Sequence, residues 1–380
     1  MRIGMLVTTL YTANPQRPSC HGVGFYVQEL LAAMLKADPE SRFILIGEKP
    51  LSLPEQLHSN PNVKEAIIPF DIRGSTKMGF WREWVMAREQ VDILHEPEPC
   101  AGIVRLSRYP LVLTVHDIIP LLFPQWFRQT HRGAFAVFTP RNIGRADAVI
   151  ALSESTRRDL ERVLPWSAGK GTVIHEAGQS LDLPEPPEAE VAALGINKPY
   201  LLTVSTIEPR KNHTTLLEAY DTIRQHGLDL QLVLAGQASW QSESILKHPS
   251  LSRYSGDVLF LGTISPEMLA YLYRNAELFI YPSLYEGFGM PPLEALTAGI
   301  PVIVGRNSSF PEVLGTAPYY LSERPTGPEI AQAVESLMGN PGLRSRLSTL
   351  GKQRAREFSW EKTASQTLQV YEDVLRRRRC

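Results

Sequence analysis

The residues best suited to chemistry lie in one loop of the second half of the chain. Glu286 and Glu294 flank a loop with glycines at 287 and 289, and Pro291 and Pro292 then open a helix. Glycines let a phosphate approach the backbone, and the first N–H groups of a helix lack partners within it. Two carboxylates can accept hydroxyl protons from different parts of one ligand. The pattern indicates a nucleotide sugar; the alternative is a ligand-free α/β crossover whose acids only complement the helix dipole.

Two adjacent cations form the second candidate group. Arg210 and Lys211 follow an apolar strand expected at Tyr200–Ser205 and precede a helix. Ligands of α/β folds bind at the carboxyl ends of strands, where such cations can neutralise a diphosphate leaving group. The alternative reading is a solvated basic face.

The first half of the chain offers weaker signals. Gly22 and Gly24 precede a helix, but Val27 stands where a dinucleotide fingerprint has its third glycine, which argues against a nicotinamide dehydrogenase. His116 ends a strand expected at Leu111–His116, where a packed, hydrogen-bonded histidine is the alternative to an active-site residue.

Four ordered motifs together resemble a known family. The segment from Ser283 to Ala295, SLYEGFGMPPLEA, resembles the Glu-x7-Glu signature of retaining glycosyltransferases of family four, which have the GT-B fold. Gly22-Val-Gly24, His116-Asp117 and Arg210-Lys211 match further motifs, so the resemblance covers nearly the whole chain. Cys20-His21 stands where the family has another glycine, which leaves the geometry of that loop open.

The resemblance implies a role for each matching residue. The two cations would bind the diphosphate, Glu286 the hydroxyls of the transferred sugar and Glu294 the ribose, while His116 would donate a hydrogen bond to the sugar. The expected catalytic residues are His116, Glu286, Arg210 and Lys211. The expected donor-binding residues are Gly22, Gly24, Ile264, Phe288, Gly289, Met290 and Glu294, the backbone N–H groups of residues 288–290 holding the diphosphate.

Metal and cofactor chemistry find little support in the sequence. No two aspartates are spaced Asp-x-Asp, and the nine histidines show no metal-ligand spacing. We therefore expect no metal and no cofactor, with cations and a helix terminus acting in their place.

Short apolar runs alternate with helical patterns, which predicts parallel sheets in two Rossmann-like domains that face a central cleft. The expected strands are Ile3–Thr8, Phe43–Gly47, Ile93–His95, Leu111–His116, Ala148–Leu152, Val173–His175, Tyr200–Ser205, Leu232–Gly236, Val258–Gly262, Leu278–Tyr281 and Pro301–Val304. The expected helices are Gly24–Ala37, Phe80–Glu89, His131–Arg145, Glu154–Val163, Asn212–His226, Ser265–Asn275, Pro291–Ala298, Pro328–Met338 and Trp360–Arg379.

A proline-rich linker at 181–188 divides the chain into an acceptor-binding domain at 1–180 and a nucleotide-sugar-binding domain at 181–359. The resemblance implies that the final helix, at 360–380, returns to the first domain.

Composition limits the number of domains, the kinds of partner and the cellular compartment. The chain has 380 residues, enough for two domains, and a net charge of −1, which gives no reason to expect a nucleic-acid partner. Three scattered cysteines and the lack of a membrane-spanning apolar run favour the cytoplasm. Aromatic and basic residues mix at 80–84 and 123–132, so peripheral contact with the inner face of the membrane stays open, against the alternative of core aromatics beside solvated cations.

The expected activity is a retaining, metal-independent transfer of a hexose from a nucleotide sugar. Because the loop motif resembles the bacterial mannosyltransferase branch, GDP-mannose is the first choice of donor; UDP-glucose, UDP-N-acetylglucosamine and dTDP-rhamnose remain alternatives. By analogy, the acceptor is a cell-surface polysaccharide or its lipid-linked precursor. The rival classes are a GT-B-shaped nucleotide-sugar epimerase and a non-catalytic nucleotide-sugar-binding protein.

Overall fold

The computed structural model describes residues 1–7, 22–47, 51, 53–67, 75–97, 109–239 and 241–379. Thr8, Cys20, His21 and the cysteines at 100 and 380 lie outside the described residues. The chain divides into two compact units: unit 1 consists of Met1–Glu176 and Ser359–Cys380, and unit 2 of Ala177–Phe358. The division falls at residue 176, just before the proline-rich segment at 181–188.

Unit 1 is built on a parallel sheet with the strand order β3-β2-β1-β4-β5-β6-β7. Its strands are β1 Arg2–Leu6, β2 Arg42–Gly47, β3 Val63–Ile67, β4 Ile93–Glu96, β5 Leu111–Val115, β6 Ala148–Ala151 and β7 Gly171–Val173. Its helices are α1 Val23–Ala37, α2 Glu55–His58, α3 Ser75–Arg88, α4 Ile119–Leu122, η1 Pro124–Trp126, α5 Gln129–Arg145, α6 Glu154–Val163, η2 Pro165–Ser167 and α16 Trp360–Arg379. The central strands are buried on both faces, as expected of a parallel sheet covered by helices.

Unit 2 repeats this plan with the strand order β10-β9-β8-β11-β12-β13, again all parallel. Its strands are β8 Tyr200–Val204, β9 Gln231–Ala235, β10 Val258–Gly262, β11 Leu278–Tyr281, β12 Val302–Gly305 and β13 Tyr319–Leu321. Its helices are α7 Glu188–Ala193, η3 Pro209–Lys211, α8 His213–Gln225, α9 Glu243–Leu246, α10 Pro249–Arg253, α11 Pro266–Asn275, α12 Met290–Ala298, α13 Phe310–Leu314, α14 Gly327–Met338 and α15 Pro341–Ala355.

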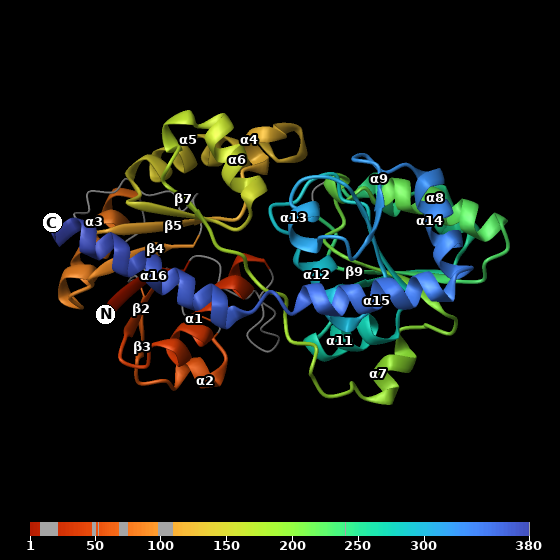
Figure 1. Ribbon diagram of the computed structural model, residues 1–380, viewed down its shortest axis with the longest axis horizontal. Helices are drawn as coiled ribbons and strands as arrows, with labels where there is room; N and C mark the ends of the chain where they lie inside the picture. Colours follow the sequence, from red (N-terminus) through yellow and green to blue (C-terminus); the bar gives the residue numbers. More distant parts are fainter. Residues whose placement is uncertain are drawn as a thin grey trace. The chain divides into compact units, whose positions relative to one another are not determined.

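The last helix, α16, is part of unit 1 although it follows unit 2 in the sequence, and it packs on α1 (Figure 1). Trp360 lies edge-on to Tyr26, with ring centroids 5.8 Å apart. The Tyr371 hydroxyl lies 2.7 Å from Nδ1 of His95, a fully buried residue of β4. The described helices include none that is long and apolar enough to span a membrane.

The predicted α/β class with two parallel sheets is confirmed. The sequence did not reveal the edge strands β3 and β13, because both are partly exposed and lack a clean apolar run. The strand expected at Val173–His175 is β7 at Gly171–Val173, and the helix α15 was missed because few of its residues are buried.

Candidate functional site

The candidate cations lie directly after the strand β8. Arg210 and Lys211 form the short helix η3, and the loop of residues 282–289 follows β11. Because β8 and β11 are neighbours in a parallel sheet, their carboxyl ends meet at the same edge. This topology brings Glu286 to the adjacent Arg210 and Lys211, although Lys211 and Glu286 are 75 positions apart in the sequence. Lys211 Nζ lies 2.6 Å from Glu286 Oε1, and Arg210 Nη1 lies 2.9 Å from Glu286 Oε2.

Further polar groups complete this cluster. Lys211 Nζ donates to the Tyr281 hydroxyl over 2.6 Å, and the Ser283 hydroxyl donates to Glu286 Oε1 over 2.6 Å. Arg210 also pairs with Glu208 at 2.7 Å. Tyr281 and Ser283 were not predicted as partners of these charges, although both stand at the carboxyl end of β11, where such residues can be sought.

The charges of this cluster are held in a nearly dry environment. Lys211 and Glu286 are each only 8% exposed. Burial alone would raise the pKa of Glu286, but the nearby charges of Arg210 and Lys211 outweigh burial and lower that pKa to about 2. Glu286 is therefore a carboxylate at neutral pH, able to accept hydrogen bonds only.

The start of α12 follows Glu286 closely in the sequence and offers backbone N–H donors. Gly289 is the N-cap with a φ of +99°, and a Cβ there would come within 2.8 Å of the Phe310 ring. Pro291 and Pro292 have no N–H. Within the described part of the chain the N–H groups of Gly289 and Met290 donate to no protein group. A helix start of this kind is suited to an anion.

Glu294 lies on α12 but outside the ion-pair cluster. Its Oε2 accepts from the Tyr273 hydroxyl at 2.9 Å, and its Oε1 accepts from the Gln179 N–H at 3.3 Å. Burial raises the pKa of Glu294, and the two hydrogen bonds only partly offset that effect. Gly178 makes room for this side chain, because a Cβ there would lie 2.9 Å from Glu294 Cγ.

His116 follows β5 in unit 1, and its contacts define the protonation of its ring. Nε2 lies 2.9 Å from the Pro97 carbonyl oxygen, which can only accept, so Nε2 carries the proton. Burial lowers the pKa of His116 to about 4, so the ring is neutral at pH 7. Nδ1 is then a hydrogen-bond acceptor, so the donor role expected from the sequence would require Nε2 to leave the Pro97 carbonyl oxygen. The ring of Tyr26 packs edge-on at 4.9 Å and fixes its orientation.

The remaining predicted residues belong to other elements of the two units. Gly22 is the N-cap of α1, with a φ of +61°, and Gly24 is buried in the first turn of that helix. Ile264 is half-buried between β10 and α11. None of the described residues form a group of three His, Cys, Asp or Glu side chains that could hold a metal ion.

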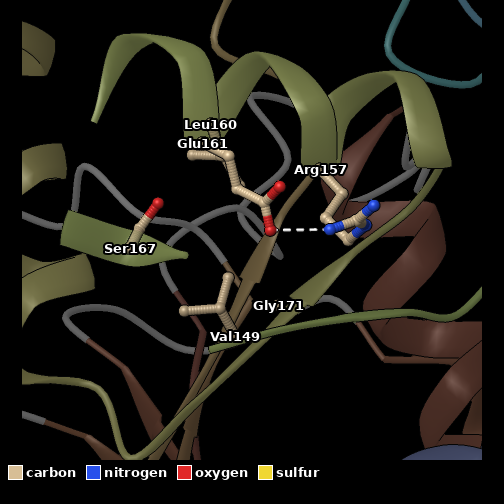
Figure 2. Close-up of a pocket in the computed structure, with 6 residues that line it drawn as sticks. All are labelled: Val149, Arg157, Leu160, Glu161, Ser167 and Gly171. Carbon is tan, nitrogen blue, oxygen red and sulfur yellow. Dashed lines mark hydrogen bonds and ion pairs between the residues drawn. The ribbon is translucent and has the colours of Figure 1, made fainter. Parts of the chain in front are cut away.

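A small cavity in unit 1, next to α6, contains none of the predicted residues (Figure 2). Arg157 and Glu161, one turn apart on α6, form an ion pair of 2.6 Å. The cavity is lined by Val149, Arg157, Leu160, Glu161, Ser167 and Gly171.

Known proteins match this chain in both sequence and fold. The family model "Glycosyl transferases group 1" matches residues 188–354, and the model "Glycosyltransferase Family 4" matches residues 21–177. The O-antigen chain mannosyltransferase B of Escherichia coli is 29% identical over 272 residues, which is 70% of this chain and 71% of that protein. The phosphatidyl-myo-inositol mannosyltransferase of Mycobacterium leprae is 27% identical over 396 residues, which is 98% of this chain and 97% of that protein.

Other relatives match only in part or only in fold. The serotype-specific mannosyltransferase WbdA of Escherichia coli is 30% identical over 58% of this chain, a match that spans 29% of WbdA. The structure of Anabaena HepE in complex with UDP and glucose superimposes with a TM-score of 0.74 and 20% identity, over 98% of this chain and all of that one. Both units thus match one family, and the chain belongs to the GT-B glycosyltransferases of family four.

Proposed function

We propose that this glycosyltransferase is a retaining, metal-independent mannosyltransferase. In this proposal it moves mannose from GDP-mannose to a saccharide or lipid-linked saccharide during cell-surface polysaccharide synthesis. The observation that carries the proposal is the ion-pair cluster of Arg210, Lys211 and Glu286, of which Glu286 lies a few residues before the start of α12 and its free N–H groups. The names of the sequence relatives support mannose as the sugar.

The cations act on the leaving group. Breaking the bond between the sugar and the phosphate leaves an additional negative charge on the nucleoside diphosphate. Arg210 and Lys211 are already fixed by hydrogen bonds to the protein, so they stabilise this charge with little reorganisation. The N–H groups of Gly289 and Met290 add neutral donors for the phosphate oxygens, and Phe288 belongs to the same proposed set. These groups supply positive potential in place of a metal ion.

The carboxylates recognise hydroxyl groups. Glu286 is ionised and already accepts from Lys211 and Ser283, and its remaining lone pairs can accept from hydroxyls of the transferred sugar. Glu294 accepts one hydrogen bond at each oxygen, which leaves capacity for the two ribose hydroxyls. We also assign two further contacts to the transferred sugar. These are Nδ1 of His116, as an acceptor, and the turn at Gly22 and Gly24. Ile264 is assigned to an apolar part of the donor.

Retention follows from an attack on the face that the phosphate leaves. The acceptor oxygen forms a bond to the anomeric carbon as the bond from that carbon to the phosphate oxygen breaks. The proton of the acceptor hydroxyl passes to the departing phosphate, so no covalent sugar–enzyme bond forms. The role of the protein in this step is to hold the diphosphate through Arg210 and Lys211 while its charge grows.

The acceptor side of the proposal includes contact with the inner face of the membrane. Helix α5 contains three arginines and no acidic residue, and Val137 on this helix is 58% exposed. On α3, Phe80 and Trp84 are 60% and 53% exposed, which suits an interface with anionic lipid. Phe123 and Trp126, by contrast, stack on one another at 4.4 Å, so this part of the second aromatic segment has apolar partners within the protein.

The experiment that tests the proposal combines the purified chain with GDP-mannose, UDP-glucose, UDP-N-acetylglucosamine or dTDP-rhamnose, with lipid-linked saccharide acceptors and with EDTA. Mannose transfer with an α-linked product, unaffected by EDTA, supports it, since the donor linkage is also α. UDP-glucose is the second candidate because HepE was solved with UDP and glucose. Donor conversion without acceptor would instead indicate an epimerase. Binding of every donor without turnover would indicate a non-catalytic protein.

A further inference from the structure

The turn between β12 and α13 contains a residue in an unfavourable backbone conformation. Ser308 has a φ of +45°, in the left-handed region that non-glycine residues rarely adopt. Ser308 is one of four non-glycine residues with positive φ in the described chain. Serine gains nothing from this conformation by itself, and glycine would adopt it without steric cost. Residues held in such conformations often serve a functional site that the surrounding structure supports.

The contacts of this turn lead to the loop that carries Glu286. Asn307 Nδ2 donates to the Ser283 carbonyl oxygen over 3.1 Å. The Ser308 hydroxyl oxygen accepts from the backbone N–H of Glu286 over 3.0 Å. The buried Ser309 hydroxyl donates to the Phe288 carbonyl oxygen over 2.7 Å. Three consecutive side chains therefore hold three successive parts of the loop between β11 and α12.

Of these three contacts, the hydrogen bond to Ser308 is the one that determines the position of Glu286. The loop backbone at Glu286 determines where its carboxylate stands, and that carboxylate contacts Lys211 and Arg210 at 2.6 Å and 2.9 Å. The positive φ turns the short Ser308 side chain toward the Glu286 N–H. The same hydroxyl donates to Asn307 Oδ1 over 3.0 Å, so its proton points away from Glu286 and its lone pair points toward it. Ser308 thus offers an oriented acceptor.

We propose that Ser308 is a positioning residue for Glu286. The strained backbone of Ser308 places its hydroxyl where it accepts a hydrogen bond from the Glu286 N–H. This contact holds the Glu286 carboxylate in position to bind Lys211 and the transferred sugar. The inference rests on the proposed role of Glu286 in binding that sugar. It adds a residue of the β12–α13 turn, more than twenty positions after the signature motif begins, to the machinery of transfer.

Two variants of Ser308 separate positioning from stability. Ser308→Gly and Ser308→Ala both lose the hydroxyl, but glycine relieves the strained φ and alanine keeps it. We expect kcat for mannose transfer from GDP-mannose to fall about tenfold in both, with KM changed less than about twofold. The melting temperature of Ser308→Gly should stay within about 2 °C of the wild type, and that of Ser308→Ala should lie roughly 2–4 °C below Ser308→Gly.

Gln241→Gly is the matched control. Gln241 also has a positive φ, of 60°, but it is exposed and lies outside the loop network, so its replacement should leave kcat unchanged. A Ser308→Gly enzyme with wild-type kcat would overturn the inference, as would a loss of kcat that follows melting temperature across the two variants. Failure of the wild type to transfer any sugar would overturn the proposed function instead, so the two failures are distinguishable.

Discussion

Replacing Lys211 by methionine removes one charge from the candidate site while keeping most of the side chain's volume. Lys211 is buried, and its Nζ contacts Glu286 Oε1 and the Tyr281 hydroxyl, both at 2.6 Å. In Lys211→Met, Glu286 keeps the ion pair with Arg210 at 2.9 Å and the hydrogen bond from Ser283. The carboxylate therefore stays ionised, but the positive charge available to a departing diphosphate is halved.

The structure sets the size of two separate effects. The lowering of the pKa of Glu286 from 4.5 to about 2 corresponds to about 3 kcal/mol in favour of the ionised form, and Arg210 and Lys211 share it. Burial lowers the pKa of Lys211 itself, so losing this charge also relieves a desolvation cost that offsets part of that stabilisation, and the melting temperature should fall by less than about 4 °C. Loss of one preorganised donor to the transition state should reduce kcat by about 100-fold or more, equivalent to about 3 kcal/mol.

The assay is mannose transfer from GDP-mannose at saturating acceptor, with circular dichroism and thermal melting on the same samples. Lys198→Met is the control, because Lys198 belongs to the same unit and pairs with Asp229 and Asp257 at 3.0 Å, away from the site. It should keep full kcat. A folded Lys211→Met enzyme with kcat within about threefold of the wild type would refute the electrostatic argument.

Further predictions concern the other buried groups. Glu294→Gln should weaken GDP binding about tenfold in calorimetry, while Glu277→Gln should not; equal loss would contradict the ribose assignment. The raised pKa of Glu294 means that GDP affinity should fall with decreasing pH at a midpoint above 4.5. Burial holds the pKa of His95 at about 3 and those of His116 and His213 at about 4, whereas the unfolded chain titrates near 6.5. The unfolded state then binds more protons, so urea titrations should show stability present above pH 6.5 and lost as pH falls toward 4, by up to roughly 3 kcal/mol per histidine. A flat profile would contradict the buried neutral rings.

The sequence predicted the parts of the site that follow from local pattern. An apolar run precedes both the Arg210-Lys211 pair and Glu286, so the sequence predicts that these residues follow strands. The parallel pairing of those strands then brings the residues together. The helix start at Met290 was readable from Gly289 and two prolines.

What the sequence could not supply depends on contacts between distant segments. Ser308 has no motif of its own, and its role appears only from a positive φ and a hydrogen bond to a residue 22 positions earlier. The donor or acceptor state of His116 depends on the Pro97 carbonyl, which no pattern places beside it. Edge strands such as β3 were missed because partial exposure removes the apolar run that reveals a buried strand.

The central claim is that the cations at 210 and 211 and the backbone N–H groups at 289 and 290 form a site for a diphosphate. Calorimetric titration of the wild-type protein with GDP and with GMP tests it most directly, because the two ligands differ only in the second phosphate. Binding of GDP at least tenfold tighter than GMP is the predicted result, since that phosphate gains charge-assisted hydrogen bonds. Equal affinity for the two nucleotides, or no binding of either, would contradict the account.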